Sequence, residues 1–167
     1  NQIWMAENLR VTKYADGTPL EYIPDSATWN DNSASSFVDT SRFYAYPNYD
    51  SLNYAYPFGA LYTWYAATNG DSVSTDTYMV QGVCPDGWHI PSNEEFVELV
   101  DYLTNHGFAG QEAIALKSIS GWEEEGNGTD DYGFNWIPAG FIEDDDAEYK
   151  QFGRFSWMWS SSKHNST

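Results

Sequence analysis

The sequence predicts a single α+β domain, because two helix signals stand among short strand-like segments and long polar loops. One helix is expected over residues 58–70 and a second directly after Ser92. The length of 167 residues suits one domain with its own core. We therefore expect residues 1–167 to form one unit with two helices, short antiparallel strands and long loops.

The amino-terminal third predicts few regular elements. Residues 1–12 alternate in a way that predicts a short strand. Residues 14–20 predict a turn, since they contain Asp-Gly and Pro. Residues 21–56 are polar and dotted with Tyr, which predicts mostly loop with short irregular elements. In residues 58–70, apolar side chains at helical spacing predict a helix that Asn-Gly ends.

The second helix has a well-defined predicted start. Ser92 is the expected N-cap, and Glu95 three residues later completes a capping box. Phe96, Val100 and Leu103 are expected to form its buried stripe. Gly107 is expected to end the helix.

The remainder of the chain predicts strand and turn pieces over residues 111–122 and 132–142. Residues 155–160 alternate aromatic and other side chains, which predicts a strand with Trp157 and Trp159 in the core. The chain has 8 Trp, 13 Tyr and 9 Phe. Since each aromatic side chain can bury roughly 150–250 Å², we expect a largely aromatic core.

The charge excludes several classes of partner. Asp and Glu number 25 against 7 Lys and Arg, for a net charge of −18. Nucleic acid is therefore not an expected partner. No apolar run approaches the ~20 residues of a spanning helix, so no membrane span is expected. The acidity and the abundance of Tyr, Asn, Ser and Thr favour an extracellular or outer cell-surface bacterial protein.

Six motifs occur in an order that resembles one known family: WMAENLR (Trp4–Arg10), GALYTWYAA (Gly59–Ala67), QGVCPDGWHIPSNEEF (Gln81–Phe96), LKSISGW (Leu116–Trp122), GNGTDDYGFNWIPAGF (Gly126–Phe141) and FSWMWSSS (Phe155–Ser162). As a set they resemble the Fibrobacter succinogenes major paralogous domain. The resemblance implies a C-type-lectin-like fold, distantly related to formylglycine-generating-enzyme-type domains. It also implies that the family's first and last strands are absent from this chain.

Five residues are expected to have structural roles. A Cys–His pair can form a nucleophile when the two groups are within hydrogen-bond reach, but a lone Cys is usually buried and inert. The resemblance points the same way, because the formylglycine-generating relatives use a cysteine pair and this chain has one Cys. We expect Cys84, His89, Ser92 and Glu95 to support the turn into the second helix, and Asp130 to cap backbone amides in a turn.

Calcium is a candidate ligand of an acidic loop. Glu143, Asp144 and Asp146 could supply carboxylate oxygens, which Ca²⁺ prefers. The spacing does not match an EF-hand. The alternative is a solvated acidic loop without a metal.

Loop aromatics are candidate ligand-binding residues. Tyr46, Tyr49, Tyr54, Trp122 and Tyr149 combine a large contact area with a polar group. The alternative is that they pack the loops onto the core.

The sequence favours a non-catalytic recognition or adhesion module that binds an extracellular glycan or protein through its loops. A second hypothesis is a structural subunit of an extracellular filament or surface assembly, in which self-assembly proceeds by strand donation. A third is a glycoside-acting enzyme with paired carboxylates. No catalytic residue can be assigned, since no nucleophile–base constellation is apparent.

Overall fold

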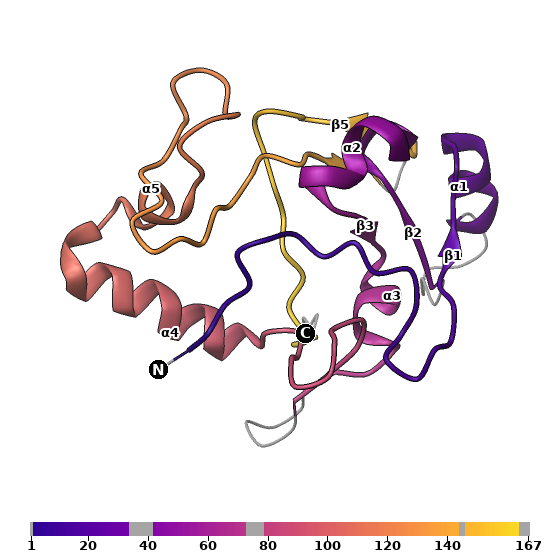
Figure 1. Ribbon diagram of the computed structural model, residues 1–167, viewed down its shortest axis with the longest axis horizontal. Coiled ribbons are helices and arrows are strands. Elements are labelled where there is room, and N and C mark those ends of the chain that lie inside the picture. Colours follow the sequence, from indigo (N-terminus) through magenta and orange to yellow (C-terminus); the bar gives the residue numbers. More distant parts are fainter. Residues whose placement is uncertain (1, 34–41, 73–78, 144–145, 164–167) are drawn as a thin grey trace.

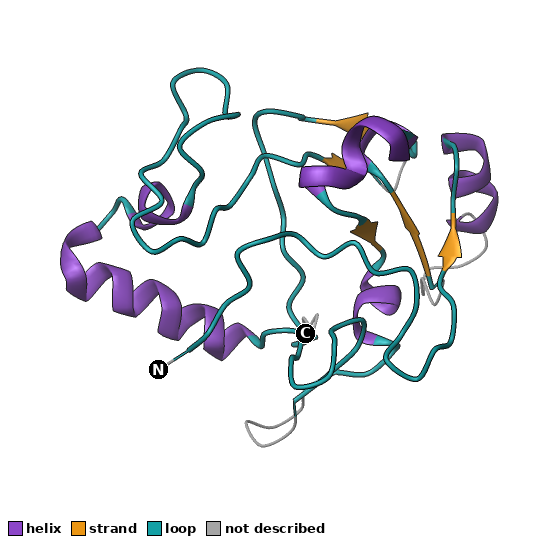
Figure 2. Cartoon of the chain, in the orientation of Figure 1, coloured by secondary structure: helices purple, strands orange, loops and turns teal. Residues whose placement is uncertain are grey.

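The computed structural model describes residues 2–33, 42–72, 79–143 and 146–163, which form a mixed α+β structure with two small sheets (Figure 1). The α+β prediction is confirmed. The prediction of two helices is wrong, because these ranges contain five α-helices, four of them eight residues or shorter. Figure 2 shows that most of the chain between these short elements is loop.

The larger sheet has three short strands in the order β1-β2-β3. They are β1 (Glu21–Tyr22), β2 (Phe43–Ala45) and β3 (Leu61–Tyr62). β1 and β2 are parallel, whereas β2 and β3 are antiparallel. The expectation of antiparallel strands is therefore wrong for the first pair, which is connected through α1 (Ser26–Ser33).

The region expected to be mostly loop contains regular structure. Besides α1 and β2, it holds the 3₁₀ turn Pro47–Tyr49 and most of α2 (Ser51–Phe58). Asp50 caps α2, because its side chain accepts hydrogen bonds from the backbone N–H groups of Leu52 and Asn53. A single carboxylate thus begins a helix in a segment whose composition favours loop.

The helix expected over residues 58–70 forms only as α3 (Trp64–Thr68). Leu61 and Tyr62 pair with β2 instead, and Thr63 then caps the helix by accepting a hydrogen bond from the Ala66 N–H. The apolar spacing of residues 58–70 favours a helix, but pairing with β2 keeps Leu61 and Tyr62 in a strand. Tertiary contacts often override local helix propensity in this way.

The long helix α4 (Asn93–Leu103) begins as predicted. The Ser92 hydroxyl accepts from the Glu95 N–H, and the Glu95 carboxylate accepts from the Ser92 N–H. The expected stripe is wrong at Val100, which is exposed. Leu99 takes its place and packs with the cluster around the fully buried Leu103.

After α4, a π-turn (Thr104–Phe108) reverses the chain into α5 (Glu112–Leu116). Gly107 has a φ of 99°, a conformation that suits glycine. α5 replaces the strand expected there, because Ala115 and Leu116 bury themselves against α4. β4 (Phe141–Ile142) and β5 (Tyr149–Lys150) then form a two-stranded antiparallel sheet.

The first residues form an irregular arm, so the strand expected over residues 1–12 is wrong. The arm is held by other parts of the chain: the Gln2 side chain donates to the Glu95 carbonyl, and the Ala60 N–H donates to the Leu9 carbonyl. The expected turn after it is confirmed by the hydrogen bond from Gly17 N–H to the Tyr14 carbonyl.

The core consists of three clusters that mix aromatic and aliphatic side chains. They are centred on Tyr14 and Tyr44, on Trp29 and Phe43, and on Leu103. The first two lie around the three-stranded sheet and the third joins α4 to α5. In Figure 1 the indigo amino-terminal arm and the yellow carboxyl-terminal segment run between these two parts.

The prediction that Trp157 and Trp159 lie in the core is wrong, since both side chains are exposed. The expected strand over residues 155–160 forms only one isolated bridge, between Ser156 and Gly140. Among the described residues, no helix is long and apolar enough to cross a membrane.

Candidate functional site

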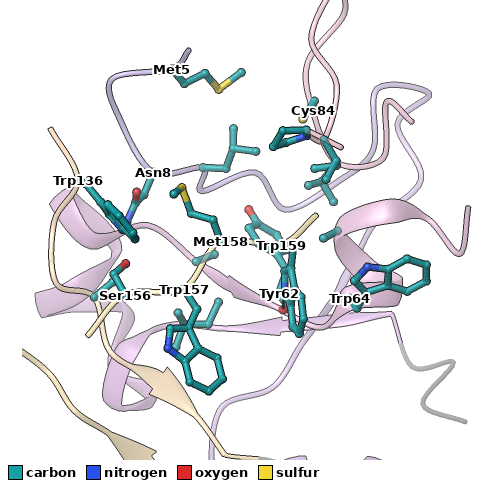
Figure 3. Close-up of a pocket in the computed structure, with 18 of the residues that line it drawn as sticks. Met5, Asn8, Tyr62, Trp64, Cys84, Trp136, Ser156, Trp157, Met158 and Trp159 are labelled. Carbon is teal, nitrogen blue, oxygen red and sulfur yellow. Dashed lines mark hydrogen bonds between the residues drawn. The ribbon is translucent and has the colours of Figure 1, made fainter. Parts of the chain in front are cut away.

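An aromatic cleft of about 1220 Å³ lies where the amino-terminal arm, the β3–α3 region and the carboxyl-terminal segment meet (Figure 3). We use the name aromatic cleft for this cavity, because large rings dominate its wall. They include Trp4, Tyr62, Trp64, Trp88, Trp157 and Trp159. The volume exceeds the range of about 300–1,000 Å³ of typical ligand pockets.

The carboxyl-terminal segment is fixed at both sides of this cleft. At one end the Gly140 N–H donates to the Phe155 carbonyl at 2.8 Å, and at the other the Ser161 N–H donates to the Pro91 carbonyl at 2.9 Å. Trp64 adds a bond from its indole Nε1–H to the Ser160 carbonyl. The residues between these anchors therefore cross the cleft at a defined position.

The residues between the anchors carry an unusual exposed surface. Trp157 is 67% exposed, Trp159 47% and Met158 40%. Trp157 stacks on Phe141 with ring centroids 4.4 Å apart and an interplanar angle of 10°. The Trp159 indole donates to the Tyr62 carbonyl at 2.7 Å. Both rings are thus held in place while one face stays open to solvent, which is typical of interaction sites.

The backbone of this segment has unused hydrogen-bonding groups. In the described part of the chain, neither the N–H nor the carbonyl of Met158 or Trp159 has a hydrogen-bond partner. Met158 and Trp159 lie next to each other on the segment in Figure 3. A backbone with free groups of both kinds can pair with a strand of another chain.

Two buried indole groups also lack acceptors. The Nε1–H groups of Trp29 and Trp136 are buried and have no hydrogen-bond partner among the described residues. Both side chains line the aromatic cleft. Buried donors are nearly always paired in native proteins, so two unpaired donors among the residues that line the cavity indicate a place for acceptor atoms.

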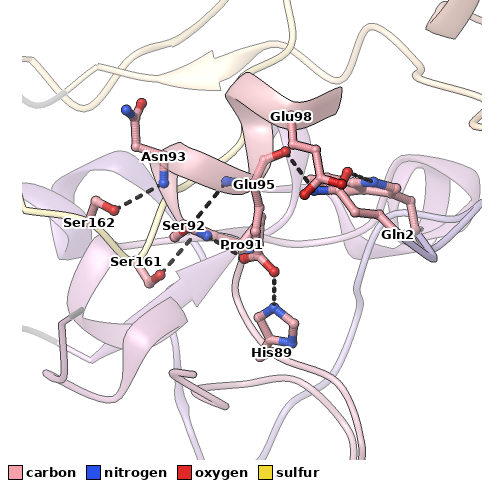
Figure 4. A network of polar contacts seen from close by, with 10 residues as sticks. Gln2, His89, Pro91, Ser92, Asn93, Glu95, Glu98, Ser161 and Ser162 are labelled. Atoms are coloured by element: carbon pink, nitrogen blue, oxygen red, sulfur yellow. Dashed lines mark hydrogen bonds and ion pairs between the residues drawn. The ribbon is translucent and has the colours of Figure 1, made fainter. Parts of the chain in front are cut away.

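The polar side chains at the start of α4 are paired with one another (Figure 4). His89 Nε2 and Glu95 Oε1 are 2.8 Å apart, while the other Glu95 oxygen accepts from the Ser92 N–H. The Asn93 N–H donates to the Ser162 hydroxyl at 3.0 Å. His89, Ser92 and Glu95 thus lie together, and they tie the turn, the helix and the carboxyl-terminal segment to each other.

Cys84 lies in the wall of the aromatic cleft but is buried. Desolvation by this burial raises the pKa of its thiol to about 11. His89 pairs with Glu95, and no hydrogen bond joins it to Cys84. The thiol therefore has neither the thiolate character nor the base partner that a cysteine nucleophile needs.

Tyr49 and Tyr149 use their hydroxyl groups inside the protein. The Tyr49 hydroxyl donates to the Ala147 carbonyl at 2.7 Å, and that of Tyr149 donates to the Ala139 carbonyl at 2.7 Å. Burial raises the pKa of Tyr49 to about 12 and also raises the pKa of Tyr149. These two tyrosines attach loops to the β4–β5 region.

The other three predicted aromatics also contact protein groups. Tyr46 packs edge-on against Tyr44, and Tyr54 packs edge-on against Phe152. Trp122 is buried, and its indole donates to the Ser118 hydroxyl. None of the five predicted aromatics lines the aromatic cleft.

The candidate calcium ligands Glu143 and Asp146 face a lysine. The Lys150 ammonium is 2.7 Å from Glu143 Oε2 and 2.6 Å from Asp146 Oδ2. The hydrogen bond from Lys150 lowers the pKa of Asp146. The third candidate, Asp144, lies outside the described residues. Calcium binding stays a prediction, and a bound ion would have to displace the Lys150 ammonium.

Asp130 lies in a turn of the segment that leads to the aromatic cleft. Its carboxylate accepts from the Asn135 N–H at 2.7 Å, and its carbonyl accepts from the Gly133 N–H. This is the amide-capping contact that the sequence led us to expect.

The sequence does not predict the aromatic cleft. The alternation of residues 155–160 predicts that Trp157 and Trp159 share one face, but the expected place of both rings was the core. The unpaired indole groups of Trp29 and Trp136 have no sequence signal, because the partners of an indole depend on residues far away in the chain.

The whole chain, residues 1–167, matches the sequence model of the Fibrobacter succinogenes major domain. Searches of curated proteins and of solved structures found no match.

Proposed function

Because this protein belongs to the Fibrobacter succinogenes major domain family, whose name states no activity, we propose a function from its site: it is a non-catalytic recognition module that binds an extracellular protein or glycan in the aromatic cleft. The observation that carries this proposal is the open face of Trp157 and Trp159 on a cavity of about 1220 Å³. Tryptophan is one of the residues enriched among binding hot spots.

The energetics support binding. Fully burying a large apolar side chain is worth roughly 1.5–3 kcal/mol, and the exposed parts of Trp157, Met158 and Trp159 offer a share of this at three neighbouring positions. Their positions are already fixed by the stacking on Phe141 and the indole bond to Tyr62. A ligand would therefore meet a preorganised surface, which reduces the entropy lost on binding.

The chemistry of the cleft supports a binding role rather than catalysis. Its thiol, Cys84, is buried and carries a raised pKa. Its imidazole, His89, is engaged with Glu95, which itself caps α4. Both groups hold the fold together at the place where a ligand would bind.

A C-type-lectin-like arrangement and a location at the cell surface or in the medium belong to the same proposal. The arm and the carboxyl-terminal segment both meet the start of α4, through Gln2–Glu95 and Ser161–Pro91. Such convergence of the two ends supports the lectin-like arrangement. The net charge of −18 supports an exported protein.

A second candidate function is a structural subunit of an extracellular assembly. The free backbone groups of Met158 and Trp159 favour it, because a strand from another copy could pair with them. Light scattering and native mass measurement distinguish the two. A recognition module stays at one chain mass over a wide concentration range, whereas a subunit forms larger species.

The test is a binding screen of defined glycans and of synthetic extended peptides, read by tryptophan fluorescence. We expect at least one class to bind, and Trp157→Ala to weaken that binding by at least tenfold. Tyr56→Ala is the matched control, since Tyr56 is equally exposed and does not line the cleft. The proposal is wrong if no member of either class binds, or if every ligand found binds the Trp157→Ala variant unchanged.

A further inference from the structure

We propose that the ligand of the aromatic cleft is an extended polypeptide strand from a partner protein, apolar at its centre and basic at its flanks, which pairs with the backbone of residues 157–159. This inference rests on the proposed function and gives the class of its ligand. Three independent features of the described residues carry it: the free backbone edge, the two unpaired indole donors and the charge of the molecule.

The free edge is the first feature. The segment is held at Phe155 by Gly140 and at Ser161 by Pro91, so the part between is anchored at both ends. Met158 and Trp159 present N–H and carbonyl groups that no described residue uses. A peptide strand offers both donors and acceptors at matching spacing, which is the basis of recognition by strand addition.

The indole donors are the second feature. Trp29 is only 4% exposed, yet its Nε1–H has no acceptor among the described residues. The Nε1–H of Trp136 is also buried and also lacks an acceptor there. Both rings line the aromatic cleft, and Figure 3 shows Trp136 across the cleft from Trp159. Carbonyl oxygens of a bound strand would satisfy such donors without introducing a charge into an apolar cavity.

The cleft favours a peptide over a sugar. Sugar recognition relies on side chains that hydrogen-bond hydroxyl groups, but three amide and imidazole side chains of the cleft already pair with protein groups. Asn8 donates to the Phe58 carbonyl, Gln2 donates to the Glu95 carbonyl, and His89 pairs with Glu95. The backbone groups of Met158 and Trp159 stay available in the described chain, and they suit pairing with a peptide backbone.

The charge is the third feature, and it selects the partner. With a net charge of −18, the protein attracts basic segments of other proteins and speeds their association. A second copy would carry the same charge and be repelled at low salt. We therefore assign the strand to a different protein, with Lys or Arg on either side of the part that enters the cleft.

The test uses three synthetic peptides of alternating Val and Thr. One carries two Lys at each end, the second has Glu in place of Lys, and the third is the Lys peptide with N-methyl groups on alternate amides. We expect the Lys peptide to bind and the N-methylated one to bind at least tenfold more weakly, because it cannot pair along one edge. The Glu peptide should also bind more weakly, and the difference should shrink as salt is added.

A variant of the protein tests the indole donors. Trp136→Phe keeps an aromatic ring but removes the Nε1–H, which has no partner in the free protein. It should weaken the Lys peptide severalfold and leave the melting temperature unchanged or higher. If Trp136 only packs, the variant lowers the melting temperature and binds the peptide as tightly as before, which contradicts the inference.

The other outcomes distinguish failure of this inference from failure of the proposed recognition function. Glycan binding that Trp157→Ala abolishes, without peptide binding, would leave a recognition module but overturn the strand. Equal binding of the N-methylated and Lys peptides would overturn strand pairing alone. Concentration-dependent association of the protein, blocked by Trp157→Ala, would identify a second copy as the occupant. Absence of all three kinds of binding would overturn both the inference and the proposed function.

Discussion

Burial controls the chemistry of individual side chains in this protein. Cys84 and Tyr49 both have raised pKa values, about 11 and about 12, and desolvation is the main cause for each. In contrast, the solvent-exposed Asp146 has a lowered pKa, because Lys150 donates a hydrogen bond to its charged form. A pair of residues such as Cys84 and His89, five apart in the sequence, therefore reveals little about reactivity until burial and partners are known.

The raised pKa of Cys84 predicts slow alkylation. At pH 8 a thiol with a pKa of about 11 is roughly 100-fold less ionised than one at its ordinary value of 9.0, and the thiolate is the reacting species. We expect iodoacetamide to label the native protein at least 100-fold more slowly than the protein unfolded in urea. Mass spectrometry over time measures both rates. Comparable rates in the two states would show that Cys84 is accessible and ionised.

At the scale of elements, local caps decide where helices begin, and long-range pairing decides how far they extend. Ser92 and Glu95 begin α4 through reciprocal hydrogen bonds only three residues apart. Thr63 begins α3 with a single side-chain hydrogen bond, but only after Leu61 and Tyr62 have joined the sheet. The same kind of cap therefore gives a predicted boundary in one case and an unpredicted one in the other.

Loss of the Ser92 cap predicts a measurable destabilisation. Ser92→Ala removes the acceptor of the Glu95 N–H at the first turn of α4, which typically costs about 1 kcal/mol. Urea denaturation should show a lower midpoint with an unchanged slope. Ser120→Ala is the control, because the Ser120 side chain is exposed and its hydroxyl has no hydrogen bond to a described residue. An equal midpoint for both variants would show that the cap does not stabilise the fold.

The whole molecule combines separate small core clusters with a large negative charge. The clusters around Tyr44, Trp29 and Leu103 lie on different sides of the aromatic cleft. Between them, the arm and the carboxyl-terminal segment make hydrogen bonds with their neighbours while Trp157 and Trp159 keep one face exposed. The aromatic cleft between the clusters is therefore an open apolar site. A partner that binds there would stabilise the folded protein.

The charge of −18 predicts a stability that increases with salt. Self-repulsion of like charges destabilises a compact state, and it extends over about 30 Å at 0.01 M salt but only about 8 Å at 0.15 M. We expect the melting temperature, followed by circular dichroism, to rise by several degrees between 0.01 M and 0.15 M sodium chloride. A fall would mean that exposed ion pairs such as Lys150–Glu143 and Arg154–Glu123 outweigh the repulsion.

The sequence by itself determined the features that rest on short-range contacts or on composition. The start of α4 follows from Ser92 and Glu95, the early turn from its Asp-Gly and Pro, and the negative charge from simple counting. The order of six motifs also indicated the family that the whole-chain match then showed. Each of these depends on residues a few positions apart or on no contact at all.

Only the tertiary structure decided the candidate site. The alternation of residues 155–160 indicates that Trp157 and Trp159 share one face, but not whether another layer covers it. In this protein residues 155–160 form a single bridge at Gly140, so the aromatic face stays open and the backbone groups of Met158 and Trp159 stay unpaired in the described chain. Periodicity in the sequence shows which side chains lie on the same face. Whether that face is buried depends on segments far away in the chain. For residues 155–160, this decides between a core strand and an exposed binding surface.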